Sequence, residues 1–571
     1  MTSGPMADAG TVHGDPGRRA RTLAPAACVA IGVLLIAGPI LATAIRSLLV
    51  WNGAWPHPSP GNLAGLLVDP RFVGAVFNTV VAGICTTALS LIGGVTLAFL
   101  VIRTDMPGRR FLGRMNLLPF FLSPYAGAMA WIWLLTPHDG ILITWTRASF
   151  DVSLEWLDIY SVPGVIFVLT LCHIPYAYLL AIPPLRDTDG AFEDTARVHG
   201  ATFWYTMRHI TLPMLLPALS TAALIVFVAS AGLLDVPLAL ALSRGIRFVP
   251  TEIYAMSQRS SELGLAAAFS VMAILGGAAL TLWHRRFSEQ GRFPAATNRG
   301  YRPRRIRLNW PARLAAWGLE AVYLSLGALL PLLILLMVSL TRIWNGRFVW
   351  RAATMVNYDA ILWRDDVTRA AIGNSLTVAA GGATICVALA AMLAVYLRFG
   401  ASRHRWPARA VLLGSGGIPA ICFGLGFLVL TWRTPLYGTL GLVVVACVAR
   451  GLPFATRNLI GQLDAIGGGQ EQMARIAGAS RDQMLRHIVL PLARPSLIAA
   501  WLLLFVVFIR ELGATIMVYG QSSETIAVAM AMQGDGSPGR AAALAVVQSA
   551  VLLVGFLAYN LTRAPLTLSP A

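Results

Sequence analysis

The sequence predicts an all-α polytopic membrane protein with about 12 transmembrane helices, arranged as two homologous six-helix halves. Hydrophobic residues make up 57% of the 571 residues and charged residues only 12%, whereas a soluble chain carries about 25% charged residues. Apolar stretches of about 20 residues, the length of a helix that spans a bilayer core, recur along the chain. A segment of the first half is also repeated in the second half. The composition excludes a soluble enzyme, a fibrous protein and a disordered chain.

Twelve apolar stretches have the length and composition of membrane spans, and glycine or proline interrupts several of them, as membrane helices tolerate. We expect the spans at residues 24–50, 73–101, 115–136, 162–184, 214–234, 264–284, 312–340, 372–397, 409–431, 437–458, 494–516 and 541–562. The predicted organisation is an N-terminal tail at 1–22, a first half at 23–286, a linker at 287–308, a second half at 309–565 and a C-terminal tail at 566–571.

The arginines determine the expected orientation. All 44 basic residues are arginine, and the net charge is +18. They gather in the N-terminal tail, in the loops after the second and eighth spans, and in the linker, whereas the opposite loops are mixed in charge. By the positive-inside rule, both termini are cytoplasmic. The basic excess therefore indicates topology and contact with membrane lipid. Nucleic acid is not an expected partner, because no basic stripe with interleaved aromatic residues is present.

Several kinds of chemistry are excluded by residue content. Lysine is absent, so the chain has no P-loop lysine and no Schiff-base lysine, and another chain must bind any ATP that drives it. The six cysteines lie in apolar stretches, and the nine histidines show no metal-ligand spacing. We therefore expect no metal, no cofactor and no catalytic activity in this chain.

The internal repeat is the most informative feature. Residues 193–213 read EDTARVHGATFWYTMRHITLP, and residues 471–491 read EQMARIAGASRDQMLRHIVLP. These segments lie 278 residues apart and align over 21 positions without a gap. A second pair of matched segments, 77–79 (FNT) and 373–375 (GNS), opens the second and eighth spans. The chain is therefore predicted to consist of two homologous halves.

Each copy of the repeat predicts a short cytoplasmic helix, a turn and the start of the next membrane helix. Acidic residues in the first turn suit the helix dipole. Gly200 and Gly478 permit a turn with positive φ, and the Leu-Pro pair that follows begins the next helix. A mere connection between spans is the alternative. Two copies in register favour docking, because paired helices suit a two-fold partner.

The pattern E-x-x-A-x-x-x-G, nine residues, I-x-L-P resembles the EAA motif of permease subunits in binding-protein-dependent ABC importers, although the triplets here read Asp-Thr-Ala and Gln-Met-Ala. The resemblance implies a type I ABC importer permease fold in a bacterial inner membrane. It implies coupling helices at about 190–210 and 468–488, two copies of a cytoplasmic ATPase that binds ATP and Mg²⁺, and a periplasmic or lipid-anchored substrate-binding protein. It assigns the coupling role to Glu193, Asp194, Thr195, Ala196, Gly200, Glu471, Ala474 and Gly478.

Two further stretches resemble a subgroup of these permeases. Residues 505–515, FVVFIRELGAT, are similar to the second half of fused ferric-iron permeases, and residues 234–237, LDVP, are similar to their first half. This resemblance favours ferric iron as the substrate, and thiamine, polyamines and aminoalkylphosphonates are the alternatives within the same class.

Charged residues inside spans usually face a cavity or one another. The candidates for the pathway or gate are Arg510, Glu511 and Asp235, and a purely structural ion pair is an equal alternative for the first two. Glu320, near the start of the seventh span, is expected to reach the membrane surface.

An ion-coupled secondary transporter is the alternative from another class, since such proteins also have two homologous halves. It would need acidic residues at mid-depth in several spans. Spans 2–4 and 8–10 contain none. The sequence therefore predicts the non-catalytic permease of an ATP-driven importer that works by alternating access.

Overall fold

The computed structural model describes residues 16–51, 56–152, 154, 156–187, 190–290, 305–399, 409, 412, 415–466, 473–474, 476–534 and 536–562. Glu471, much of the linker, most of the N-terminal tail and the C-terminal tail lie outside the described residues.

The described residues of the first half form helices and one short antiparallel pair of strands, β1 (Leu49–Trp51) and β2 (Pro56–Pro58). Its helices are α1 (Pro16–Ser47), α2 (Gly61–Val68), α3 (Pro70–Arg103), α4 (Arg109–Met115), η1 (Leu118–Phe121), α5 (Pro124–Leu135), α6 (Ile141–Phe150), α7 (Val162–Asp187), α8 (Ala191–Val198), α9 (Phe203–Thr206), η2 (Met207–Thr211), α10 (Leu212–Ala231), α11 (Asp235–Leu240), η3 (Leu242–Arg244), α12 (Val249–Ser257), η4 (Ser260–Glu262) and α13 (Leu263–Gln290).

The described part of the second half contains helices and the turns that connect them, and no strand. Its helices are α14 (Trp310–Leu324), η5 (Ser325–Leu329), α15 (Leu330–Ser339), η6 (Trp350–Ala352), α16 (Val356–Asp359), η7 (Ala360–Arg364), α17 (Asp366–Phe399), η8 (Ser415–Gly417), α19 (Ala420–Thr431), α20 (Leu440–Ile466), α22 (Arg481–Met484), η9 (Leu485–Val489), α23 (Leu490–Ile509), α24 (Thr515–Val518), α25 (Ile526–Gln533) and α26 (Pro538–Thr562).

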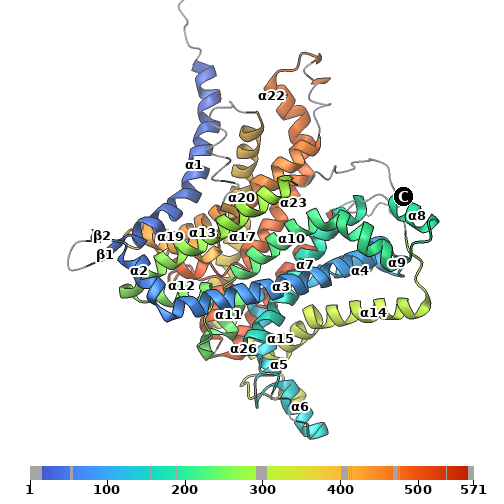
Figure 1. The fold of residues 1–571 in the computed structure, drawn as a ribbon. Helices are drawn as coiled ribbons and strands as arrows, with labels where there is room; N and C mark the ends of the chain where they lie inside the picture. Colours follow the sequence, from blue (N-terminus) through green and yellow to red (C-terminus); the bar gives the residue numbers. More distant parts are fainter. Residues whose placement is uncertain are drawn as a thin grey trace, which may run out of the picture.

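Ten helices in the described part of the chain are long and apolar enough to cross a membrane, and one bent helix pair brings the number to eleven. This confirms the predicted class, an all-α polytopic membrane protein. In Figure 1, α22 lies at the top of the molecule and α8 at its right edge, whereas α2, α12 and the β1–β2 pair lie at the left.

The first helix of each half packs against the other half. Helix α1 contacts α13 of its own half, but it also packs along α17 and α19 of the second half. Conversely, α15 packs against α5 of the first half as well as against α26. The halves are therefore joined by exchanged helices, and the contacts between them are not limited to one flat interface.

Two predicted spans, 115–136 and 409–431, are not continuous membrane helices. In the first half the chain bends by 86° between the helical stretches Arg109–Phe121 and Pro124–Leu135. In the described part of the second, η8 is followed by Pro419 and the short helix α19. Proline has no N–H to donate and disfavours helical backbone at the residue before it. Ser123-Pro124 and Ile418-Pro419 therefore break both spans, a signal that hydropathy alone does not register.

The matched landmarks at the starts of α3 and α17 hold the short helices α12 and α25 in equivalent ways. The hydroxyl of Thr79 accepts a hydrogen bond from the N–H of Val249 at 2.9 Å. In the second half, the hydroxyl of Ser375 accepts one from the N–H of Ile526 at 2.7 Å. The polar residues of these landmarks thus satisfy the first N–H groups of a helix that folds back into the bundle.

The segment that precedes α14 is hydrogen-bonded to the end of α3. Thr104 and Ile306 form a parallel bridge. The N–H of Leu308 and the guanidinium of Arg313 both donate to the Asp105 carboxylate at 2.8 Å. The backbone hydrogen bond, followed by the one from Arg313, lowers the pKa of Asp105.

Glu320 lies at a second contact between the two halves. Its side chain is fully buried, so the expectation that it reaches the membrane surface is wrong. The Asn116 amide donates a hydrogen bond to Glu320 Oε1 at 3.3 Å, and the Tyr323 hydroxyl donates to the Asn116 carbonyl at 2.9 Å. Because α14 packs its inward face on the chain around α4, the carboxyl group is enclosed before it can reach water.

Candidate functional site

The first copy of the repeat forms a helix that ends in a left-handed glycine. Helix α8 has Glu193 in its first turn. At its end Gly200 has a φ of +81°, and the N–H of Ala201 donates to the carbonyl of Ala196 at 2.9 Å. This is the hydrogen bond of a Schellman motif, in which glycine takes the position with positive φ. The turn expected from the sequence is therefore present.

The second copy ends in the same way. Gly478 has a φ of +78°, and the N–H of Ala479 donates to the carbonyl of Ala474 at 3.0 Å. Both pairs of alanines are 278 residues apart in the sequence. The alanine and glycine of the motif thus have a shared structural role, which is to close the helix. Glu471 lies outside the described residues.

Each turn leads into a π-helical segment and then a long apolar helix. The N–H of Leu212 bonds to the carbonyl of Met207 in η2, and the N–H of Leu490 bonds to that of Leu485 in η9. Pro213 and Pro491 stand next, and since proline cannot donate, the wider π turn replaces the missing bond. The Leu-Pro pair begins α10 and α23 as predicted, although the helical path already starts several residues earlier.

Glu193 points into the protein and not toward solvent. Its carboxylate accepts a hydrogen bond from the Thr211 hydroxyl at 2.8 Å and pairs with Arg103 at 3.5 Å. Arg103, which is only 1% exposed, also donates to the carbonyl of Leu185 at 2.9 Å. Glu193 therefore fixes α8 relative to α3 and α7.

An equivalent arginine stands at the end of α17. Arg398 donates to the carbonyl of Leu463, which aligns with Leu185, and lies 3.7 Å from Asp464. The side chains of Asp194 and Ala196 are partly covered, Ala474 is buried, and the Thr195 hydroxyl bonds within its own helix. The motif residues therefore mostly shape the turn, and other side chains provide its outer surface.

That outer surface is apolar. Val198 is 86% exposed, and Ile476, its aligned position in the second half, is 85% exposed. Further large hydrophobic side chains are exposed beside them: Phe192, Phe203, Trp204, Tyr205 and Met473. Exposed apolar groups at matched places on two turns are typical of a docking surface.

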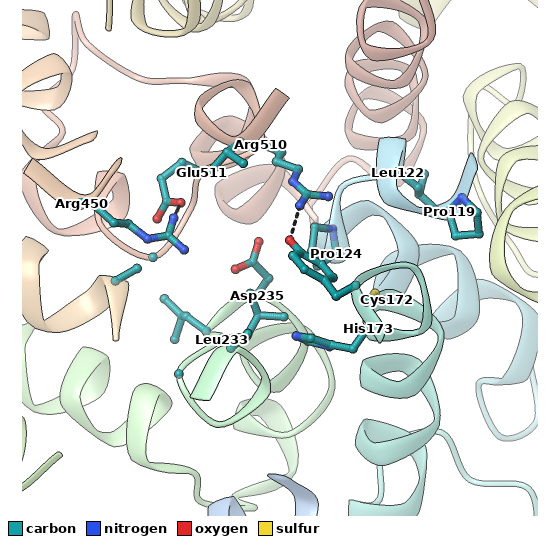
Figure 2. Close-up of a pocket in the computed structure, with 17 residues that line it drawn as sticks. Pro119, Leu122, Pro124, Cys172, His173, Leu233, Asp235, Arg450, Arg510 and Glu511 are labelled. Carbon is teal, nitrogen blue, oxygen red and sulfur yellow. Dashed lines mark hydrogen bonds and ion pairs between the residues drawn. The ribbon is translucent and has the colours of Figure 1, made fainter. Parts of the chain in front are cut away.

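A cavity of about 80 Å³ lies between the two halves, and Figure 2 shows the side chains that face it. By a comparable measure one water needs about 10–15 Å³, so the cavity can hold several waters or a small ion. It collects all three predicted pathway residues. Its lining is Pro119, Leu122, Pro124, Cys172, His173, Tyr176, Ala229, Gly232, Leu233, Leu234, Asp235, Ala420, Arg450, Val507, Arg510, Glu511 and Gly513.

Arg510 reaches from the second half into the first. Its guanidinium donates to the carbonyl of Phe120 and, at 2.7 Å, to the hydroxyl of Tyr176, and it lies 4.3 Å from the centre of the Phe120 ring. In a continuous helix the Phe120 carbonyl would accept from residue 124, which is a proline. The break at Pro124 therefore leaves that carbonyl available to Arg510.

Glu511 has its partners within the second half. One carboxylate oxygen forms an ion pair with Arg450 of α20, and the other accepts the N–H of Ala514 at 3.1 Å. Helix α23 ends at Ile509, so Arg510 and Glu511 lie in the segment after it and take separate partners. The predicted pair is therefore two distinct interactions, one across the halves and one inside the second half.

Asp235 is the acidic residue that the first half supplies to the cavity. It is 4% exposed and begins α11. In Figure 2 its carboxylate lies between Arg450 on one side and Arg510 on the other. Within the described part of the chain, no arginine forms an ion pair with it at 4 Å or less.

Three polar residues of the cavity were missed by the sequence reasoning: Arg450, His173 and Tyr176. Arg450 stands inside the predicted span 437–458, so the rule that singled out Arg510 also applies to it. The ring of His173 bonds to the Leu169 carbonyl at 2.8 Å and stacks on Tyr176, and it also lines the cavity. Pro175 inside α7 and its aligned residue Pro453 inside α20 are close to these residues in the sequence.

Comparison with known proteins identifies the family. A family model described as "Binding-protein-dependent transport system inner membrane component" matches residues 61–290. PhnV of Salmonella paratyphi A, whose name assigns it to a 2-aminoethylphosphonate transport system as a permease, is 32% identical over 251 residues, which are 42% of this chain and 91% of PhnV.

Two other relatives are permease proteins of named transport systems. The molybdenum permease ModB of Mycobacterium bovis is 27% identical over 256 residues, 44% of this chain and 89% of ModB. The sulfate permease CysW of Escherichia coli K12 is 26% identical over 148 residues, 26% of this chain and 48% of CysW. PhnV and ModB are matched over nearly their whole length by less than half of this chain, as expected for a chain with two permease halves. The chain belongs to the family of binding-protein-dependent transport system inner membrane components, the permeases of ABC importers, in a fused form with two homologous halves.

Proposed function

We propose that this chain forms the substrate pathway of an ATP-driven importer in a bacterial plasma membrane, with both termini in the cytoplasm. Two copies of an ATPase subunit bind ATP and Mg²⁺ and dock on the cytoplasmic turns. A periplasmic or lipid-anchored binding protein delivers the substrate to the opposite side. The chain itself catalyses no reaction.

The observation that carries this proposal is the matched pair of docking turns. Both turns end in the hydrogen bond of a Schellman motif. Each also exposes a β-branched apolar side chain at the aligned position, Val198 in the first and Ile476 in the second. Two identical ATPase subunits need two similar surfaces, and a duplicated chain supplies them. The arginine-rich loops next to α3 and α17 support the cytoplasmic assignment of this side.

The docking turns are mechanically connected to the cavity. Each turn runs into a long helix, α10 or α23, whose far end contributes a lining residue, Ala229 or Val507. A displacement of the turn by the ATPase therefore shifts both walls of the cavity. Alternating access follows when the two halves separate first at one side of the membrane and then at the other.

We propose a small oxyanion as the substrate class, in place of the ferric iron favoured by the sequence resemblance. The names of the three relatives refer to a phosphonate, to molybdenum and to sulfate. Two guanidinium groups, Arg450 and Arg510, line the cavity. Guanidinium groups bind planar pairs of oxygen atoms in carboxylates and phosphates, whereas they repel a bare cation. An aminoalkylphosphonate, one of the alternatives predicted within the class, fits this chemistry.

The test is uptake by proteoliposomes that contain this chain, its ATPase subunits and its binding protein. We expect ATP-dependent uptake of at least one of 2-aminoethylphosphonate, sulfate and molybdate. ATP-independent uptake driven by an ion gradient would contradict an ABC mechanism. Uptake of ferric iron, thiamine or putrescine without uptake of any oxyanion would contradict the substrate class.

A further inference from the structure

Three arginines from the two halves lie together where α4 and the segment before α14 meet the end of α3. Arg109 and Arg110 begin α4, and Arg305 lies in the segment before α14. That segment is held at the end of α3 by the parallel bridge between Thr104 and Ile306. The guanidinium groups of Arg110 and Arg305 both repel that of Arg109. The fold therefore brings three like charges close together.

This arginine cluster, Arg109, Arg110 and Arg305, is not neutralised by the protein around it. Within the described residues, none of the three forms an ion pair at 4 Å or less or a side-chain hydrogen bond. Asp105 attracts Arg109, but its carboxylate already accepts hydrogen bonds from Arg313 and from a backbone N–H. The positive-inside rule accounts for the sign of these charges, but not for their gathering at one place. A bound anion would relieve their repulsion.

An exposed apolar stripe on α14 lies beside the arginine cluster. It consists of Trp310, Leu314 and Trp317, which are 72%, 61% and 41% exposed. Their spacing of four and three residues places them on one face of the helix. The Trp317 ring lies next to Gly108, because a Cβ added to this glycine would come within 3.4 Å of the ring. Since Gly108 directly precedes Arg109, the stripe and the cluster are neighbours.

We infer that the arginine cluster and the apolar stripe together bind an anionic phospholipid from the leaflet on the cytoplasmic side. The phosphate of its headgroup accepts hydrogen bonds from the guanidinium groups, and its acyl chains cover the stripe. A soluble phosphate compound would satisfy the arginines but leave the stripe exposed.

The position of the site suits a lipid. Helix α14 is the first part of the membrane-spanning stretch Trp310–Ser339, so its exposed apolar residues face the hydrocarbon. Arginines at the cytoplasmic end of such a helix lie at the level of the headgroups. Because the cluster contains residues of both halves, one bound headgroup links the first half to the second. The site is separate from the central cavity and does not depend on which substrate the protein carries.

The experiment is native mass spectrometry of the full chain, purified in detergent with its ATPase subunits and titrated with one lipid at a time. The probes are phosphatidylglycerol and phosphatidylcholine with the same acyl chains, which both carry a phosphate but differ in net charge. We expect phosphatidylglycerol to bind about tenfold more tightly or better. It should also raise the apparent Tm of the complex, because its headgroup links the two halves. Soluble glycerol 3-phosphate at the same concentration should do neither.

A triple variant tests the headgroup end of the site. Replacing all three residues of the arginine cluster by glutamine should abolish the preference for phosphatidylglycerol, so that both lipids bind alike. The matched control also removes three positive charges, but from exposed arginines of the loop after α15, on the opposite side of the membrane. This control should keep the preference, and it consists of Arg342→Gln, Arg347→Gln and Arg351→Gln.

A second variant tests the acyl-chain end. Leu314→Gln places a polar group in the middle of the stripe and should weaken the binding of both lipids by the same factor, with the charge preference retained. The control is Leu319→Gln, since Leu319 is also exposed on α14 at 43% but lies five residues further on and therefore on another face of the helix. It should bind both lipids like the wild type.

The unaltered complex can refute the inference without any variant. Equal binding of the two lipids would show that the arginine cluster does not select an anionic headgroup. Glycerol 3-phosphate that competes as well as phosphatidylglycerol would assign the cluster to a soluble phosphate compound. A triple variant that keeps the lipid preference but no longer holds the ATPase subunits would show that the cluster is a protein contact, and it would overturn the lipid site.

Discussion

Val198 and Ile476 lie 278 residues apart and are exposed to the same extent, 86% and 85%, each two residues before a glycine with positive φ. Two large apolar side chains at equivalent positions of two turns do not stabilise the isolated chain, because neither is covered by it. The proposed docking of two ATPase subunits would cover both.

Val198→Asp and Ile476→Asp should therefore weaken ATPase binding without reducing the amount of folded permease. Covering a valine or isoleucine side chain contributes about 1.5–3 kcal/mol, which corresponds to a loss of about tenfold or more in affinity. The measurement is co-purification of the ATPase subunit and its stimulated activity. The control is Val68→Asp on α2, since Val68 is 83% exposed but lies away from α8 and α22. Unchanged ATPase binding in both variants would argue against docking at these turns.

Gly200→Val and Gly478→Val should impair coupling through backbone strain. No atom lies within 4 Å of an added Cβ at either position, so a clash is not the cause. A β-branched residue at φ near +80° is an outlier whose cost is about 1–2 kcal/mol or more. Uptake and stimulated ATPase activity should fall at matched membrane abundance, with different magnitudes in the two halves because their acidic residues differ.

A control for this strain is available in the same chain. Gly245 has a φ of +69° and equally open surroundings, but it follows η3 and is not part of the repeat. Gly245→Val carries the same backbone cost and should leave coupling intact. Gly200→Asn should also retain function, since asparagine adopts the left-handed conformation more readily than valine. Normal coupling in both valine variants of the repeat would remove the glycines from the docking mechanism.

Arg510→Ala should reduce uptake more completely than Arg510→Lys. The lysine variant keeps a positive charge near the Tyr176 hydroxyl, although an ammonium group cannot reproduce the two separate hydrogen bonds of the guanidinium. The direct hydrogen-bond partners of Arg510 are neutral, so the alanine variant does not leave a directly bonded carboxylate without its partner. We therefore expect this variant to fold. Uptake at matched abundance, with basal ATPase activity measured beside it, is the test. Full uptake by Arg510→Ala would show that neither gate nor pathway depends on this charge.

Glu320→Gln should preserve or raise the thermal stability of the chain, whereas Glu320→Ala should lower it. The second oxygen of the Glu320 carboxylate and the side-chain oxygen of Asn116 are both buried, and neither has a hydrogen-bond partner in the described residues. When Glu320 is ionised, both of these oxygens can only accept hydrogen bonds. The side-chain amide of a glutamine at position 320 adds a donor beside the Asn116 oxygen. A satisfied buried hydrogen bond contributes about 0.5–1.5 kcal/mol. The measurement is the apparent Tm in detergent, and a glutamine variant less stable than the alanine variant would contradict this account.

Local sequence alone determined the membrane class, most of the spans and the two turns of the repeat. Hydropathy fixes the spans because a bilayer requires long runs of apolar residues with internally satisfied backbone. The positive φ of Gly200 and Gly478 could be predicted because only a few neighbouring residues decide how a helix ends. The breaks at Pro124 and Pro419 are also signalled locally, by the prolines themselves. A hydropathy average over about 20 residues does not register a single proline.

The cavity was decided by tertiary structure. The sequence singled out Arg510, Glu511 and Asp235 one by one, but it could not show that Arg510 crosses to Phe120 of the other half while Glu511 stays with Arg450. Those partners lie between 61 and 390 residues away in the chain, and only the packing of the helices brings them together. For the same reason Glu320 could not be recognised as buried, because a residue's depth depends on what the other half places against it. Local sequence fixes backbone conformation, whereas the partners of a charge are fixed by the fold.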